Sequence, residues 1–216
     1  MAQSRGTCAY CGKETTKGSI NKHLEGCTKR LEVMTAAKGT PETLLHLRVQ
    51  ATNSDFWLNL EMRGATTLSK LDGYLRAIWL ECCGHMSQFG DYGREIGKSR
   101  KAEAVFVPGA TLLHLYDFGT TSETLMSCLG VRTGIATTKH PIALLARNVL
   151  PLTECVICQK PAQWYNPAYE WEGEFGALCD DHKDDNPHTD EFDASAIYNS
   201  PRMGVCGYDG PAAPPY

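Results

Sequence analysis

Two groups of cysteine and histidine residues, one near each end of the 216-residue chain, constrain its fold more than any other feature. The first has the spacing C-x2-C-x11-H-x3-C and comprises Cys8, Cys11, His23 and Cys27. The second has the spacing C-x2-C-x20-C-x2-H and comprises Cys155, Cys158, Cys179 and His182. Two close ligand pairs separated by a loop are the usual pattern of a tetrahedral structural Zn²⁺ site. The sequence therefore predicts two zinc-binding modules, in which metal binding is part of folding.

The ten cysteines could instead form a disulfide framework or be small buried residues. The first residues, Met1 to Arg5, contain no apolar run of the kind that a signal peptide needs. No run of about 18 apolar residues exists either, so no membrane span is predicted. We therefore expect a cytoplasmic protein with no membrane partner, and in that reducing compartment the same spacings favour metal over disulfides.

The two quartets divide the chain into three predicted segments. Residues 1–40 would form the first zinc finger and a linker that begins at residue 31, and residues 41–150 would form the middle domain. Residues 151–216 would form the second zinc module with an acidic tail rich in proline and glycine. Within the first finger, Ile20 and Leu24 have helical spacing, and a helix there would present His23 and Cys27, at i and i+4, on one side.

Apolar periodicity in the middle segment predicts an α+β fold. Alternating apolar residues indicate strands at 45–51 and 56–62, and further apolar stretches indicate strands at 105–107, 113–118, 125–129 and 142–149. An apolar stripe predicts one principal helix over 68–82, with Thr67 as its N-cap, and residues 90–103 are predicted to be a loop. This order of elements favours a mainly antiparallel sheet with one principal helix, flanked by the two small zinc modules.

The middle segment resembles the plasmid pRiA ORF-three-like family, some of whose members carry a transposon resolvase-like label. The resemblance rests on residues 68–89, which include His85-Met-Ser-Gln-Phe89, and on Leu115-Tyr-Asp-Phe-Gly-Thr-Thr121. The quartets and residues 199–208 resemble a subgroup with added metal-binding ends. The resemblance implies an α+β fold over residues 44–150 and a protein of mobile elements. Many members have Asp-Ser-Trp after the glycine, where this chain has Thr120-Thr121-Ser122.

The segment Cys82-Cys83-Gly84-His85 is the most suggestive feature between the quartets. With Cys206 it could form a third metal site, for which Cys82, Cys83, His85 and Cys206 would be the ligands. The alternative is that these are small buried residues at a helix end, because no second close pair of ligands fixes the geometry. His85, His114 and Asp117 could form a polar cluster, but a strand over 113–118 would place His114 and Asp117 on opposite faces.

Charge is distributed unevenly along the chain, whose net charge is −4. Residues 1–40 hold seven Lys or Arg and three Glu, whereas residues 151–216 hold three Lys or Arg and twelve Asp or Glu. The basic finger could therefore contact nucleic acid, and the acidic end favours contacts with protein. The candidate phosphate-contacting residues of the finger are Lys13, Lys17, Lys22, Lys29 and Arg30.

The favoured hypothesis is a zinc-binding, non-enzymatic adaptor that binds nucleic acid or protein, of the mobile-element type that the resemblance implies. It is favoured because ligand spacings are abundant and no coherent catalytic constellation is visible. The alternative is a metal-dependent nuclease or hydrolase acting in the middle domain around His85 and Asp117. Such an enzyme would need an open coordination position, whereas each terminal quartet already supplies four ligands.

Overall fold

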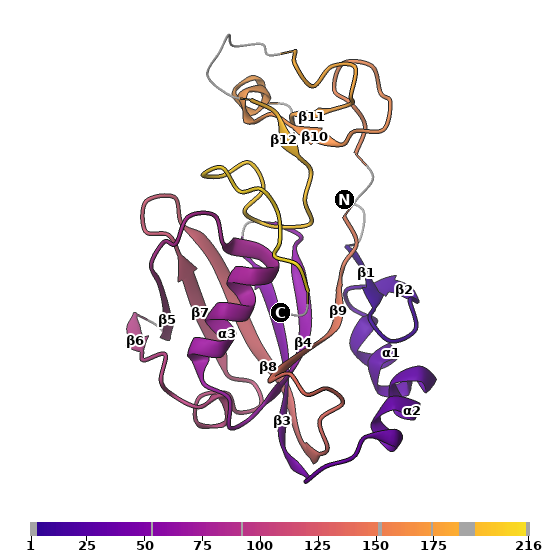
Figure 1. Cartoon of the computed structure of the whole chain (residues 1–216), viewed down its shortest axis with the longest axis vertical. Coiled ribbons are helices and arrows are strands. Elements are labelled where there is room, and N and C mark those ends of the chain that lie inside the picture. Colours follow the sequence, from indigo (N-terminus) through magenta and orange to yellow (C-terminus); the bar gives the residue numbers. More distant parts are fainter. Residues whose placement is uncertain are drawn as a thin grey trace.

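A nine-stranded sheet forms the centre of the molecule and takes strands from both the first and the middle segments (Figure 1). The computed structural model describes residues 4–52, 54–91, 93–150, 153–173, 175–185 and 193–214. The strand order is β2-β1-β9-β4-β3-β8-β7-β5-β6, and every neighbouring pair is antiparallel. The strands are β1 (Arg5–Cys8), β2 (Glu14–Thr16), β3 (Glu42–Ala51), β4 (Trp57–Arg63), β5 (Ser87–Asp91), β6 (Arg94–Ile96), β7 (Thr111–Tyr116), β8 (Ser122–Gly134) and β9 (Ile142–Asn148).

The helices lie beside this sheet and complete an α+β fold, as the sequence predicts. The α-helices of the described chain are α1 (Ile20–Gly26), α2 (Thr28–Ala36) and α3 (Leu68–Leu75). Helix α3 continues into a π-helical turn, η1 (Arg76–Leu80), and two 3-10 turns are η2 (Ala102–Ala104) and η3 (Pro167–Glu172). Thr67 is the N-cap residue of α3, although its side chain makes no capping hydrogen bond. No described helix is both long enough and apolar enough to cross a bilayer.

The main core lies between α3 with η1 and one face of the sheet. Strand residues point alternately to the two faces, so Leu45, Leu47 and Val49 of β3 face this core and are fully buried. Leu71 and Leu75 of α3 complete the same apolar cluster. Burial of the apolar stripe predicted for residues 68–82 therefore explains why residues 68–80 are helical, whereas residues 81 and 82 lie beyond the helix.

The first module, which holds the first predicted zinc quartet, covers part of the opposite face of the sheet. Arg48 of β3 points to this side and donates hydrogen bonds to the side-chain oxygen of Asn21 (2.9 Å) and to the carbonyl of Lys17 (3.4 Å). Trp57 is fully buried in a second apolar cluster with Ile20, Leu24 and Leu145. Gly6 on β1 permits this packing, because a Cβ atom there would lie 2.2 Å from the Trp57 ring.

A buried carboxylate joins helix α2 to the sheet. Glu61 of β4 is 6% exposed and accepts hydrogen bonds from Arg30 at the start of α2 (3.3 Å) and from Arg132 of β8 (2.9 Å). One guanidinium partner, Arg30, belongs to the first module and the other, Arg132, to the middle segment. The first module is thus held to the sheet by an ionic contact as well as by apolar packing.

Three local predictions are wrong. The predicted linker from residue 31 is mostly helical, because α2 extends to Ala36; none of its residues is buried, so it lacks the apolar periodicity that identifies a helix. The strand predicted at 105–107 does not form, since the chain there follows the 3-10 turn η2 and buries Phe106 instead of the two valines. The predicted loop 90–103 contains the short edge strand β6, whose exposed residues give no alternating pattern.

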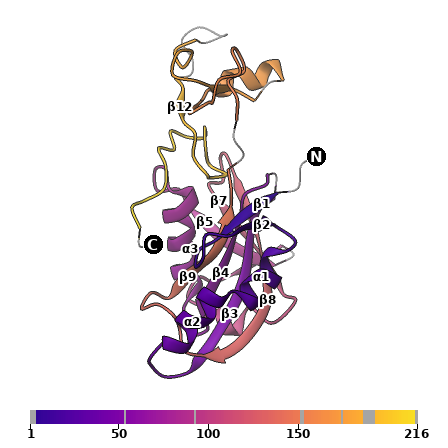
Figure 2. The ribbon, with the colours of Figure 1, turned by 90° about the vertical axis from the view of Figure 1, so that its right-hand side faces the viewer.

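The last segment of the chain forms a small second sheet and then returns to the main one. The second sheet has the order β11-β10-β12, with β10 (Trp164–Tyr165), β11 (Ala177–Leu178) and β12 (Ser195–Ala196). After β12 the chain runs back toward α3 and η1, and the amide of Ala212 donates to the carbonyl of Ala77 on η1 (2.8 Å; Figures 1 and 2). Residues 186–192 and 215–216 of the predicted acidic tail lie outside the described residues.

Candidate metal centres

Three groups of four side chains in the described structure bring three sulfurs and one imidazole together. In each group the four candidate ligand atoms all lie within 4.8 Å of one another. We name them by their first residues: the Cys8 cluster (Cys8, Cys11, His23, Cys27), the Cys82 cluster (Cys82, Cys83, His85, Cys206) and the Cys155 cluster (Cys155, Cys158, Cys179, His182). Each group is of a type that could bind a zinc ion.

The Cys8 cluster forms where β1 meets α1. Cys8 ends β1, and a tight turn bonded from the Gly12 amide to the Cys8 carbonyl (2.9 Å) brings Cys11 back beside it. The Cys11 sulfur lies 3.3 Å from Nε2 of His23, and the Cys8 and Cys27 sulfurs lie 3.9 Å apart. Cys27 is not on α1, as i and i+4 spacing had predicted, but at its extended C-cap, because α1 ends at Gly26. The four predicted ligands nevertheless converge.

The Cys155 cluster is built by two tight turns of the second sheet region. Nδ1 of His182 lies 3.3 Å from the Cys179 sulfur and 3.5 Å from that of Cys155, and the Cys158 and Cys179 sulfurs are 3.6 Å apart. Burial alone would raise the pKa of Cys155, but backbone amides of Cys179, Cys158 and Ile157 donate to its sulfur and lower that pKa to about 6. The local backbone thus favours a thiolate, which is the form that binds metal.

The Cys82 cluster joins residues that are far apart in the sequence. Cys82 and Cys83 follow the π-helical turn η1, His85 precedes β5, and Cys206 arrives from the returning C-terminal segment. The Cys83 sulfur lies 2.9 Å from Nε2 of His85, 3.6 Å from the Cys82 sulfur and 3.5 Å from the Cys206 sulfur. The fold therefore brings these four ligands together, although the sequence around Cys206 contains no second close pair of ligands.

The geometry and the acid–base chemistry of the clusters fit a bound cation. Zinc–sulfur bonds of 2.3 Å in a tetrahedron place sulfurs about 3.8 Å apart, and four sulfur pairs of the clusters lie between 3.5 and 3.9 Å apart. Hydrogen bonds with Cys206 and Cys82 raise the pKa of Cys83 to about 12, and burial raises the pKa of Cys8 to about 11. Crowded thiols resist ionising together, and a divalent cation removes that obstacle.

Arg202 lies beside the Cys82 cluster and balances charge there. Its side chain is fully buried; Nη2 contacts the Cys82 sulfur (3.6 Å) and the carboxylate of Asp117, and Nη1 donates to the carbonyl of Thr120 (2.5 Å). The hydrogen bond from Arg202 lowers the pKa of Asp117 to about 2, so this carboxylate is charged. Three thiolates around Zn²⁺ carry a net charge of −1, which a neighbouring guanidinium would offset.

The structure separates the residues of the predicted polar cluster into two groups. Nε2 of His85 lies 3.5 Å from the carboxylate of Asp117. His114 lies elsewhere, fully buried, with its Nε2 2.9 Å from Asp72. Strand β7 ends at Tyr116, and Asp117 follows with φ of 64°, so the expected alternation of faces does not extend to it. A three-residue site of His85, His114 and Asp117 is therefore not formed.

A polar network around Asp72 is the feature of the middle domain that sequence reasoning missed. Asp72, on the inner face of α3, accepts hydrogen bonds from Ser87 (2.6 Å), Arg76 (3.0 Å) and Lys98 (3.2 Å) as well as contacting His114. Lys98 also lies 2.6 Å from the Ser87 hydroxyl. Burial opposes ionisation of Asp72, but its bonds with His114 and Ser87 lower its pKa well below the usual range. The sequence signal for this network was Asp72 itself, a charged residue within the predicted apolar stripe.

This network predicts that acid destabilises the fold through His114. Burial lowers the pKa of His114, so its imidazole stays neutral in the folded protein, while in the unfolded chain it titrates near 6.5. The unfolded state therefore binds the proton first, and the free energy of unfolding falls as the pH drops below about 6.5. We expect the stability advantage of wild type over His114→Gln, measured by urea unfolding, to be smaller at pH 5.5 than at pH 7.5.

Taking the difference between the two proteins cancels the loss of metal in acid, which they share. An advantage that is equal at both pH values would show that the folded and the unfolded chain bind a proton at His114 equally, contrary to its buried, neutral state.

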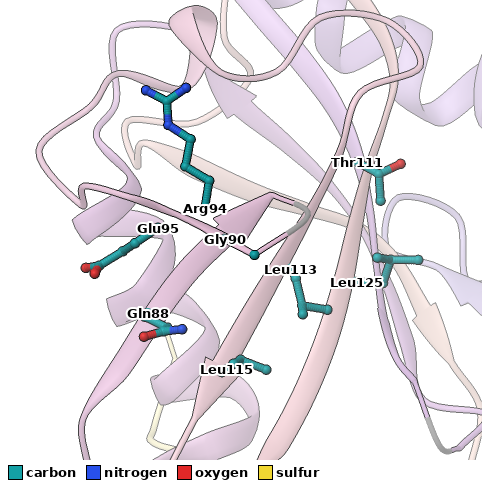
Figure 3. A pocket seen from close by; sticks show the side chains of 9 residues that line it. Gln88, Gly90, Arg94, Glu95, Thr111, Leu113, Leu115 and Leu125 are labelled. Atoms are coloured by element: carbon teal, nitrogen blue, oxygen red, sulfur yellow. The ribbon is translucent and has the colours of Figure 1, made fainter.

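A cavity of about 530 Å³ lies over β5, β7 and β8, on the face of the sheet opposite α3 and away from the clusters (Figure 3). Leu113 and Leu115 of β7 and Leu125 of β8 form its apolar floor, and Arg94 stands at its edge. Leu113 is directly opposite Leu125 on one side and Gly90 on the other, so the missing Gly90 side chain leaves the hollow open. None of the predicted metal ligands lines this cavity.

Comparisons with known proteins do not assign the chain to a family. No family model and no curated protein matches it. Among solved structures, a protein of unknown function from Methanosarcina mazei Go1, MM3350, matches with 14% sequence identity and a TM-score of 0.41. The match covers 48% of this chain and 67% of that chain. The resemblance to the plasmid pRiA ORF-three-like family therefore stays a prediction.

Proposed function

We propose that this protein is a non-enzymatic adaptor whose binding surfaces are held in place by three structural zinc ions. The observation that carries the proposal is the number and closure of the donor sets: three clusters of four converging ligands. Four protein ligands complete the tetrahedral shell of structural zinc and leave no position for a substrate or reactive water. Each ion would also join different elements: β1 to α1, η1 to the C-terminal segment, and the turns around the second sheet.

The contacts of His85 and Asp117 favour the adaptor over a metal-dependent nuclease or hydrolase. His85 faces Cys83 and Cys206, and Asp117 is engaged by Arg202. A catalytic zinc site needs an open coordination position for water or substrate. In this cluster the three sulfurs and the His85 imidazole would occupy all four positions around a zinc ion. Asp117 lies near His85 because it pairs with the buried guanidinium of Arg202, which stands beside the same cluster.

Nucleic acid is the partner that we propose for the first module. Its exposed surface carries Lys13 and Lys22, for which the described chain holds no ion pair. Two other predicted contact residues are less available: Arg30 bonds to Glu61 and is only 11% exposed, and Lys29 pairs with Glu32 at 3.0 Å. Phosphate contacts would therefore centre on Lys13 and Lys22, while α1 itself packs on the sheet through Ile20 and Leu24.

We further propose that the acidic C-terminal module contacts a basic protein. Residues 151–216 carry an excess of nine negative charges, which would repel phosphates. Asp180 lies on the exposed surface of the Cys155 cluster region and accepts a hydrogen bond from Trp164 (2.7 Å). Opposite charges at the two ends of the molecule suit an adaptor that bridges two kinds of partner.

The first module predicts salt-sensitive binding to nucleic acid. We expect fluorescence anisotropy of a labelled 20-base-pair duplex to show binding that weakens as salt increases, because each phosphate contact releases counterions. Replacing both Lys13 and Lys22 by glutamine should reduce the magnitude of the slope of log K against log [salt] by about 1.8, because each lost phosphate contact accounts for about 0.9. Removing residues 1–40 is a poorer test, because it also deletes β1 and β2 from the sheet.

Lys139→Gln is the matched control, since Lys139 is an exposed lysine outside the first module. It should leave the slope unchanged. No binding at 20 mM salt, or equal slopes for wild type and the double variant, would remove nucleic acid as the partner of this module.

A further inference from the structure

The Cys82 cluster differs from the other two in the exposure of its sulfurs. Cys83 and Cys206 are both exposed and Cys82 is half-buried. In the Cys8 cluster Cys8 and Cys27 are buried, and in the Cys155 cluster Cys155 and Cys179 are buried. A soluble oxidant can therefore reach two sulfurs of the Cys82 cluster, but at most one well-exposed sulfur in either of the others.

The two exposed sulfurs of the Cys82 cluster are also near neighbours. The sulfurs of Cys83 and Cys206 are 3.5 Å apart, and a disulfide needs about 2.05 Å. Both residues lie in turns next to glycines with positive φ: Gly84 at 78°, and Gly207 at 65°. A Cβ atom at either glycine would meet no atom within 4 Å, so the turns have room to adjust. Cys82 is a less suitable partner for Cys83, because the two are adjacent in the chain.

We propose that the Cys82 cluster is an oxidation-sensitive zinc site, at which a hydroperoxide converts Cys83 and Cys206 into a disulfide and releases one Zn²⁺. The inference rests on the proposed zinc occupancy of this cluster. One thiolate attacks an oxygen of hydrogen peroxide and the O–O bond breaks. Hydroxide is the leaving group, and the attacking cysteine becomes a sulfenic acid. The other thiolate attacks that sulfur, the S–S bond forms, and a second hydroxide leaves. Each sulfur loses one electron and each peroxide oxygen gains one.

Oxidation would leave the zinc ion with two protein ligands, Cys82 and His85, which are too few for a stable site. The C-terminal segment would nevertheless stay attached, because the new disulfide joins the same two chain segments as the metal. Ser200 also remains bonded to the carbonyl of Trp79 (2.7 Å), and Arg202 to Asp117. The site would thus exchange a metal cross-link for a covalent one and deliver one zinc ion to solution.

The test is to count zinc by native mass spectrometry on the full chain and then to add hydrogen peroxide. Released zinc is followed by the absorbance of 4-(2-pyridylazo)resorcinol, and disulfides are mapped by peptide mass spectrometry. We expect three zinc ions before oxidation and rapid release of one, together with a Cys83–Cys206 disulfide. Cys206→His keeps four ligands but cannot form this disulfide, so it should release zinc at least tenfold more slowly.

The outcomes separate this inference from the proposed function. Three bound ions with no release by peroxide, or with first release from the Cys8 or Cys155 cluster, would overturn the oxidation-sensitive site and leave zinc-organised folding intact. Two bound ions before oxidation, with Cys82, Cys83 and Cys206 all reactive toward an alkylating reagent, would overturn both the third zinc ion and the inference. Release from Cys206→His at the wild-type rate would also overturn it.

Discussion

A chain in which Cys8 is replaced by serine is expected to lose one zinc ion and the packed interface between the first module and the sheet. Cys8 is a buried member of the Cys8 cluster and also the last residue of β1, paired with Ala146 of β9. Structural zinc contributes an apparent 10–16 kcal/mol, roughly, to the folding of isolated finger peptides. The small core of such a module is not large enough to offset that loss. The module should therefore unfold while the main core persists.

Hydrogen exchange and the zinc count would reveal this result together. The amide of Val149 donates to the carbonyl of Arg5 and the amide of Ala9 to that of Leu145, so loss of β1 should deprotect the β1 and β9 edge. Trp57, now fully buried, should become accessible to a fluorescence quencher. Cys128→Ser is the matched control, because Cys128 is buried on β8 outside every cluster and should leave the zinc count unchanged. Retention of full zinc content by Cys8→Ser would contradict the proposed role of this cluster.

Replacing Arg202 by methionine is expected to cost about 3–5 kcal/mol of folding free energy, the usual result of removing one partner from a buried ion pair. The side chain of Arg202 is 0% exposed and that of Asp117 is 7% exposed, so water and ions scarcely reach this pair. Methionine fills similar space but removes the guanidinium that pairs with the Asp117 charge and donates to the Thr120 carbonyl. Urea unfolding of the zinc-loaded protein would measure the change.

A double-mutant cycle isolates the ionic part of this effect. Asp117→Asn removes the charge yet keeps an oxygen for the Gly119 amide (2.9 Å) and suits the positive φ of this position. We expect the double variant to be more stable than Arg202→Met alone, since it no longer buries an unpaired charge. Arg94→Met, at an exposed arginine, should change stability by less than about 0.5 kcal/mol. Additive effects of the two buried changes would contradict the pairing.

Local spacing was sufficient to predict two of the clusters. In the Cys8 and Cys155 groups all ligands fall within one short segment, so ligand pairs and loop lengths carry the signal. The Cys82 cluster needs Cys206, which the returning C-terminal segment brings from more than 120 positions away. The role of its neighbour Arg202 was not predictable from spacing, because a single arginine in a turn-rich segment is usually exposed.

The same distinction between local and long-range information explains the fold predictions. Alternation located β3 and β4, and the apolar stripe located α3, because each buries one face against the core. Helix α2 and strand β6 bury almost nothing, so no periodic signal marks them. The insertion of β1 beside β9 was also not predictable, since it depends on contacts between residues near 6 and residues near 147.

The pairing of β1 with β9 has a consequence for synthesis on the ribosome. The first module emerges early, but the strand that completes its edge is made about 135 residues later, which takes roughly 7–27 s at 5–20 residues per second. During that interval a zinc-loaded module would present an unpaired strand edge, the kind of surface that joins neighbouring nascent chains. The short length of β1, four residues, limits that hazard until its own partner arrives.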